Sequence, residues 1–172
     1  MKVYLIIGAT GAGKTTYALK LAREKNAFRF SVDEWMENLY QKDWPQKDVY
    51  SWALERTQRI EKQILDNLQQ FKELRINTVL DLGFFKREHR EKIYAFLDNK
   101  EIPFELHYLD VAPDVRWKRV QKRNEQKGET YSLEVTKEMF DFCEDLFEEL
   151  GQDELSLDTT IVTVDHLKNA HN

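Results

Sequence analysis

A glycine-rich stretch near the start of the chain combines the residue types and the spacing that hold phosphate groups. It follows the pattern Gly8-x-x-x-x-Gly13-Lys14-Thr15 within the sequence GATGAGKTT. Glycines let successive backbone N–H groups point inward around an anion, a lysine reaches the β- and γ-phosphates, and a threonine hydroxyl ligates Mg²⁺. The stretch therefore predicts that the chain binds a nucleotide polyphosphate. The candidate contact residues are Gly8, Ala9, Thr10, Gly11, Ala12, Gly13, Lys14, Thr15 and Thr16.

Such a loop needs a buried strand before it and a helix after it. The apolar run from Val3 to Ile7 precedes the loop, and a helical sequence over 15–25 follows it. At the start of that helix, free amide groups and the helix macrodipole favour phosphate oxygens. The alternative is a glycine-rich turn that only joins a strand to a helix, and the complete spacing with both flanks disfavours it.

The rest of the chain alternates short β-like runs with helical ones, which indicates an α/β fold with a parallel sheet covered on both faces. We expect five strands, at 2–7, 27–31, 76–82, 104–110 and 160–164. We expect helices at 15–25, 48–71, 86–99, 113–128 and 135–150. The apolar residues of the second of these helices recur on one side, so we expect that side to lie in the core.

Length and composition predict one domain over 1–168, because 172 residues suit a single hydrophobic core. The sequence has no apolar run that could cross a bilayer and no secretory leader, so we expect a cytoplasmic protein without a membrane partner. The one cysteine, Cys143, excludes an intrachain disulfide and is expected on the core side of a helix. The net charge of −5 disfavours broad nucleic-acid binding. The sequence does not determine the oligomeric state.

A loop of this kind occurs in GTPases, ring-forming ATPases and small kinases. The pair Asn99 and Lys100 would need an aspartate at the position of Ile102 to recognise guanine, and it precedes a strand. The segment from Asp81 to Gly83 is one residue too short for a GTPase switch. A ring ATPase needs a further helical domain, for which 172 residues leave no room. The compact kinase design remains.

Carboxylates at strand ends are candidates for the chemistry, because ligands gather at the carboxyl ends of parallel strands. Three lie there: Asp33, Asp81 and Asp110. Asp33 is the best candidate for a catalytic base that orients an acceptor hydroxyl and takes its proton. It could also cap a helix that starts at Glu34, and the two roles are compatible. Asp81 would hold Mg²⁺ directly or through water, with a turn carboxylate as the alternative.

The helix expected over 113–128 carries a basic stripe. Its members, at spacings of three, four and four, are Arg116, Arg119, Arg123 and Lys127. These spacings place them on one side of a helix. No acidic residue interrupts the stripe between the first and third members, which favours a mobile lid over a solvated helix face. Arg119 and Arg123 are the better candidates for stabilising the charge on the transferring phosphoryl group.

Five stretches together carry a resemblance to a known family: GATGAGKTT, SVDEW, VLDLGFFKREHREK, HYLDVAPDVRWKRVQKRNEQKG and VTKEMFDF. In this order they resemble the P-loop kinase group of polynucleotide kinase, chloramphenicol phosphotransferase and zeta toxins, including proteins named AAA-family ATPases, over roughly residues 2–147. The resemblance implies a five-stranded parallel sheet of order 2-3-1-4-5, with ATP and Mg²⁺ as cofactors. It also implies γ-phosphate transfer to a hydroxyl. Asp33 matches the general base of these relatives, and the arginines of 119–127 match those that clamp the donor phosphates.

One departure concerns the acceptor. Polynucleotide kinases carry an arginine three residues after the base, where this chain has Met36. Glu34 and Glu37 beside it make the region less suitable for an anion. We therefore expect a hydroxyl of a small molecule as the acceptor and disfavour a nucleic-acid end. The rival hypotheses are a nucleotide-dependent switch or regulatory ATPase, and an enzyme like polynucleotide kinase.

An aromatic flap is predicted near 35–56. Its aromatic residues are Trp35, Tyr40, Trp44, Tyr50 and Trp52. They suit a partly apolar or sugar-like acceptor, although they could instead pack the flap onto the body, above all Trp52. Arg87 and Arg90, at the start of the helix over 86–99, could face a ligand or solvent.

Overall fold

The structure of the chain is a computed structural model, and it describes residues 1–126 and 134–163. Its centre is a five-stranded sheet in which all pairs are parallel and the strand order is β2-β3-β1-β4-β5. The strands are β1 (Val3–Ile7), β2 (Ala27–Ser31), β3 (Asn77–Asp81), β4 (Phe104–Leu109) and β5 (Thr159–Val162). The expected fold class and strand order are confirmed.

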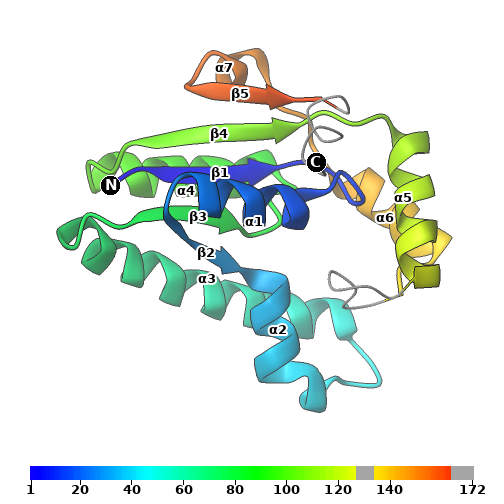
Figure 1. Cartoon of the computed structure of the whole chain (residues 1–172). Coiled ribbons are helices and arrows are strands. Elements are labelled where there is room, and N and C mark those ends of the chain that lie inside the picture. The colour runs from blue at the N-terminus through cyan, green and yellow to red at the C-terminus, as the bar shows by residue number, and fades with distance from the viewer. Residues whose placement is uncertain (127–133, 164–172) are drawn as a thin grey trace.

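The helices follow the strands in the order that crossover connections require. They are α1 (Lys14–Glu24), α2 (Val32–Tyr40), the 3₁₀ turn η1 (Gln41–Asp43), α3 (Val49–Glu73), α4 (Arg87–Asn99), α5 (Pro113–Gln126), α6 (Lys137–Leu146) and α7 (Gln152–Leu155). In Figure 1, α5 and α6 lie beyond the carboxyl ends of the strands, on the side where β1 leads into α1. This arrangement brings the loops after the strands to one edge of the sheet.

The central part of the sheet is buried on both faces because helices pack on each of them. Along β1, Leu5 points towards α3 and α4 and packs in one core cluster with Ile64 and Leu97. The next residue, Ile6, points the other way and packs with Leu21 of α1 in a second cluster. Every residue of β1 is buried, as expected for the central strand of a parallel sheet.

The long helix expected over 48–71 is confirmed as α3, which buries Ile60, Ile64 and Leu68 in the core. The helix expected over 113–128 is described as far as Gln126, and its last two residues lie outside the described residues. The tail after residue 168 also lies outside them. Among the helices of the described part, none is long and apolar enough to span a membrane.

The last long helix is shorter than expected. It begins after Thr136, whose hydroxyl accepts a hydrogen bond from the Met139 amide, and ends at Leu146 instead of residue 150. The reason is tertiary: the Glu148 amide donates to the carbonyl of Phe85, which requires extended backbone after α6. Cys143 is half-buried, and Phe140 is the buried residue of this helix, so the expected core position of the cysteine is only partly met.

Candidate functional site

The phosphate-binding loop connects β1 to α1, and two of its glycines adopt conformations that other residues rarely take. The backbone angle φ is 78° at Gly11 and 97° at Gly13, the residue that precedes α1. A Cβ atom on Gly11 would also lie 2.7 Å from the carbonyl oxygen of Arg116. The loop can therefore keep this tight path only with glycine at these positions, and such a path allows backbone amides to point towards an anion.

Lys14 lies within this loop at the start of α1. Its Nζ atom donates to the carbonyl oxygens of Gly8, at 2.8 Å, and Ala9, at 3.2 Å. Burial lowers the pKa of Lys14, and the nearby carboxylates of Asp81 and Asp33 oppose that shift. Both candidate carboxylates therefore act electrostatically on Lys14.

Arg116, the first member of the basic stripe, is buried and supports the loop from behind. Its guanidinium donates to the carbonyl oxygens of Val111, at 2.7 Å, and Thr10, at 3.2 Å, and forms an ion pair with Glu144 of α6. These contacts satisfy its donors within the protein. The prediction that Arg116 faces polyphosphate from a lid is wrong, because this position of α5 points into the protein.

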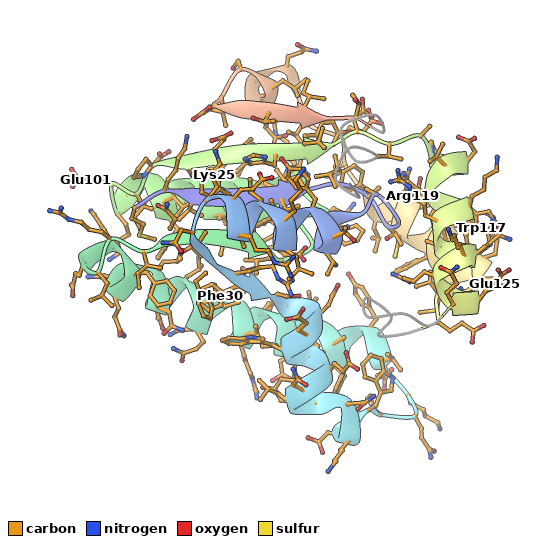
Figure 2. The ribbon with its side chains drawn as sticks, viewed as in Figure 1. Lys25, Phe30, Glu101, Trp117, Arg119 and Glu125 are labelled. Carbon is orange, nitrogen blue, oxygen red and sulfur yellow. The ribbon has the colours of Figure 1, made fainter. Side chains whose placement is uncertain are left out.

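Arg119 and Arg123 lie where the stripe was expected to act. Both line a cavity of about 190 Å³ with residues of the loop and of α1, which are Gly11, Gly13, Thr15, Thr16 and, from α5, Val120. Arg119 projects from α5 towards the loop (Figure 2) and donates to the carbonyl oxygen of Ala12 at 3.0 Å. The buried Nε of Arg123 has no hydrogen-bond partner within the described residues. This cavity is the candidate site for the donor phosphates.

Asp33 lies in the first turn of α2 and is exposed. The cap of that helix is Ser31, whose hydroxyl accepts a hydrogen bond from the Glu34 amide at 3.4 Å. The alternative in which Asp33 caps a helix starting at Glu34 is therefore wrong, since α2 begins two residues earlier. The Asp33 carboxylate instead lines a cavity beside α2, described below.

Asp81 is the last residue of β3 and is buried. Burial raises the pKa of Asp81 to about 6, while Lys14 opposes the shift and Asp33 adds to it. Its Oδ2 atom accepts from Nη1 of Arg29 on β2 at 3.2 Å, and the same guanidinium pairs with Glu34. Sequence reasoning missed Arg29; its signal is a charged residue between two phenylalanines in the strand sequence AFRFS.

The residues around the loop fit Mg·ATP. Thr15 lines the donor cavity with a hydroxyl available as a ligand, and the buried Asp81 carboxylate lies near Lys14. In the described ranges, no group of three or more His, Cys, Asp or Glu side chains could enclose a metal ion. A cation here would therefore share its coordination with phosphate oxygens and water, which is the usual arrangement for Mg²⁺.

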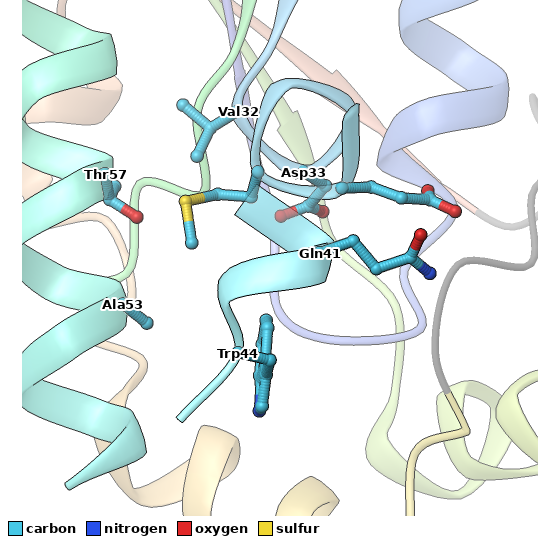
Figure 3. A pocket seen from close by; sticks show the side chains of 8 residues that line it. Val32, Asp33, Gln41, Trp44, Ala53 and Thr57 are labelled. Carbon is cyan, nitrogen blue, oxygen red and sulfur yellow. The ribbon is translucent and has the colours of Figure 1, made fainter. Parts of the chain in front are cut away.

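A second cavity, of about 490 Å³, lies between α2, η1 and α3. Its lining residues are Val32, Asp33, Met36, Glu37, Gln41, Trp44, Ala53 and Thr57. Figure 3 shows Ala53 and Thr57 on α3 facing Val32 and Asp33 on α2, with Trp44 closing one end. A cavity of this size holds a small organic molecule. Of its lining residues, Asp33 is the one whose charge acts on Lys14 of the phosphate-binding loop.

The predicted flap is a helical hairpin built from α2, η1 and the start of α3. Of its five aromatic residues, only Trp44 lines the cavity. Trp52 packs against Trp44, with ring centroids 5.3 Å apart, and Trp35 packs against the core residue Phe30 at 5.7 Å. Trp35 therefore packs the hairpin onto the body, as the packing alternative expected, whereas Trp52 packs within the hairpin against Trp44 and Tyr40.

Arg87 and Arg90 serve neither cavity. Arg90 is completely buried, and its guanidinium binds both carboxylate oxygens of Glu154, at 2.7 and 2.9 Å. Arg87 pairs with Asp153 and Glu91. These contacts fasten α4 to α7, so both arginines are structural.

The parallel sheet of order 2-3-1-4-5, with a phosphate-binding loop between its central strand and the following helix, defines the P-loop NTPase fold in its kinase form. Residues 3–150 match the family model AAA_33, described as an AAA domain. The chain belongs to this family. No curated protein sequence matches the chain.

Solved structures support the same fold. A gluconokinase from Sinorhizobium meliloti is 15% identical, with a TM-score of 0.66 over 98% of this chain and 89% of its own. The APS kinase CysC of Mycobacterium tuberculosis, in complex with AMPPNP and APS, is 15% identical, with a TM-score of 0.61 over 98% and 92%. Kti12 from Chaetomium thermophilum, in complex with ADP-AlF3, is 13% identical, with a TM-score of 0.68 over 95% and 89%. At these identities the likeness shows the fold alone.

Proposed function

We propose that the protein is an ATP-dependent kinase that transfers the γ-phosphate of ATP to a hydroxyl of a small molecule. The observation that carries the proposal is the position of Asp33. Its carboxylate lines the cavity of about 490 Å³, and Asp33 follows the carboxyl end of β2, at the same end of the parallel sheet as the loop that follows β1. One carboxylate therefore connects a cavity suited to an acceptor with the site of the donor phosphates. The similar folds of a gluconokinase and an APS kinase agree with this class of reaction.

The proposed reaction is an in-line displacement at the γ-phosphorus. The acceptor hydroxyl lies against Asp33, which takes its proton as the oxygen bonds to phosphorus and the bond to the β-phosphate oxygen breaks, releasing ADP. Lys14, Arg119 and Arg123 stabilise the negative charge on the phosphoryl oxygens. Mg²⁺, held by Thr15 and Asp81, would neutralise charge on the β- and γ-oxygens.

A nucleotide-dependent switch is the second candidate, and the contacts of α5 favour it. Arg116 and Arg119 both bind carbonyl oxygens of the loop, and Arg116 also pairs with Glu144 of α6. A change in the loop would therefore reach α6, which exposes Met139 and Phe142. The fold is shared with Kti12, solved with ADP-AlF3.

The deciding experiment is a transfer screen with γ-labelled ATP over pooled hydroxyl compounds, including sugars, nucleosides and amino alcohols. The proposal expects the label to move to at least one pool, with Lys14→Ala protein as the inactive control. A label that appears only as inorganic phosphate, at the same rate in every pool, together with an ATP-dependent protein partner, would establish the switch instead.

A further inference from the structure

The cavity of about 490 Å³ between α2, η1 and α3 has an acidic lining. It contains two carboxylates, Asp33 and Glu37, and two neutral hydrogen-bonding side chains, Gln41 and Thr57. The rest of the lining that the structure describes is apolar or aromatic, and it contains no Lys, Arg or His. The donor cavity, by contrast, is lined by two arginines. The two cavities therefore suit ligand parts of opposite charge.

Glu37 is the carboxylate that the proposed reaction leaves without a role. It lies four residues after Asp33 on α2, so both side chains project from the same side of the helix. It is exposed and has no ion-pair partner in the described ranges, whereas Glu34 is neutralised by Arg29. A carboxylate in this position can receive a cation from the cavity without breaking an existing contact.

Trp44 supplies a second feature that suits a cation. One part of its indole packs against Trp52, yet 48% of the residue stays exposed, and it lines the same cavity as Glu37. An aromatic face beside a carboxylate binds an ammonium group through both cation–π and ionic attraction. A phosphate or carboxylate on the ligand would face two carboxylates, and none of the described lining residues carries a positive charge to offset them.

We propose that the acceptor is an amino alcohol or amino sugar, whose ammonium group binds Glu37 beside the indole of Trp44 while one of its hydroxyls reaches Asp33. This inference rests on the proposed kinase function and names its substrate class. Glu37 is thus the residue that selects the acceptor by charge. Gln41 and Thr57 supply neutral hydrogen bonds that fix the orientation of the ligand.

The test is a binding titration without ATP, with two pairs of probes. Each pair contains an amine and its neutral N-acetylated form: neamine and N-acetylated neamine, and phenylalaninol and N-acetylphenylalaninol. Trehalose 6-phosphate is the anionic probe. We expect the amine of at least one pair to bind about three- to tenfold more tightly than its N-acetylated form, the range of a partly exposed ion pair with a cation–π contact. Trehalose 6-phosphate should bind most weakly.

Glu37→Gln should remove the preference for the amine and leave the affinity for the N-acetylated form unchanged. Asp43→Asn is the matched control, since Asp43 is exposed in η1 of the same hairpin but outside the cavity lining, and it should keep the preference. Equal binding of amine and neutral form in both pairs, tighter binding of the phosphate, or a preference that survives Glu37→Gln would overturn the inference. Because no ATP is present, this result is independent of whether phosphate is transferred.

Discussion

Replacing Asp33 by Asn separates catalysis from structure more cleanly than any other single change. Asn keeps the size of the side chain and removes the carboxylate that would accept the hydroxyl proton. General base catalysis contributes on the order of 10²–10⁴-fold, and the loose transition state of phosphoryl transfer favours the lower half of that range. We therefore expect kcat to fall about 10²–10³-fold, equivalent to about 3–4 kcal/mol of barrier.

The structure also sets the expected cost in stability. Asp33 is exposed in the first turn of α2, and Ser31 makes the capping hydrogen bond. The variant should lose only the favourable interaction of a charge with the helix N-terminus, about 0.3–1 kcal/mol. A fall in kcat with an almost unchanged melting temperature and KM for ATP would therefore isolate the chemical role.

The assay is steady-state kinetics with an acceptor from the transfer screen, beside a thermal melt of the same preparations. Asp110→Asn is the control, because Asp110 is also an exposed carboxylate at the end of a strand, β4, but lines neither cavity. It should leave kcat unchanged. An Asp33→Asn protein as fast as wild type would refute the reasoning, and the base would then have to be sought at Asp81.

Three further predictions concern the donor site and the acceptor. Mg·ATP should raise the melting temperature of the wild type, because a ligand that binds only the folded state stabilises it, and Lys14→Ala should lose most of that shift in the same melt. Wild type should label an oligonucleotide with a 5′-hydroxyl no faster than Lys14→Ala protein does, because Met36 occupies the position of the arginine that binds the acceptor phosphate in polynucleotide kinases. Rapid labelling by wild type would contradict a small-molecule acceptor. The folded protein retains the Asp81 proton up to about pH 6, whereas the unfolded chain releases it near the ordinary value of 3.8, so rising pH between these values favours unfolding. Between about pH 4 and pH 7, the free energy of unfolding of the wild type should therefore fall by up to about 3 kcal/mol relative to that of Asp81→Asn. Denaturant melts in which the two proteins differ in unfolding free energy by the same amount at every pH would contradict this effect of burial.

Features that depend only on residues close together in the sequence could be predicted without the structure. The loop from Gly8 to Thr15 works through consecutive amides and one helix N-terminus, so its residue types and spacing are sufficient to recognise it. The alternation of apolar runs and helical periods likewise predicted the parallel sheet, and α3 was expected within two residues of its observed end.

Features that depend on which surfaces pack together required the tertiary structure. Arg116 and Arg119 are alike in the sequence, but the packing of α5 buries the first against Glu144 and leaves the second beside the phosphate loop. Spacing along a helix shows which residues share a side, but not whether that side meets another helix or a cavity.

The same limit applies to the acceptor side of the site. Asp33 was recognised from its place after a strand, but the cavity that it lines exists only because α3 packs beside α2 and η1. The pairing of Arg29 with Asp81 joins residues 52 positions apart, through neighbouring strands. Local sequence determined which residues are candidates for the chemistry, whereas long-range packing decided which of them line a cavity, because contacts between distant segments depend on the whole fold.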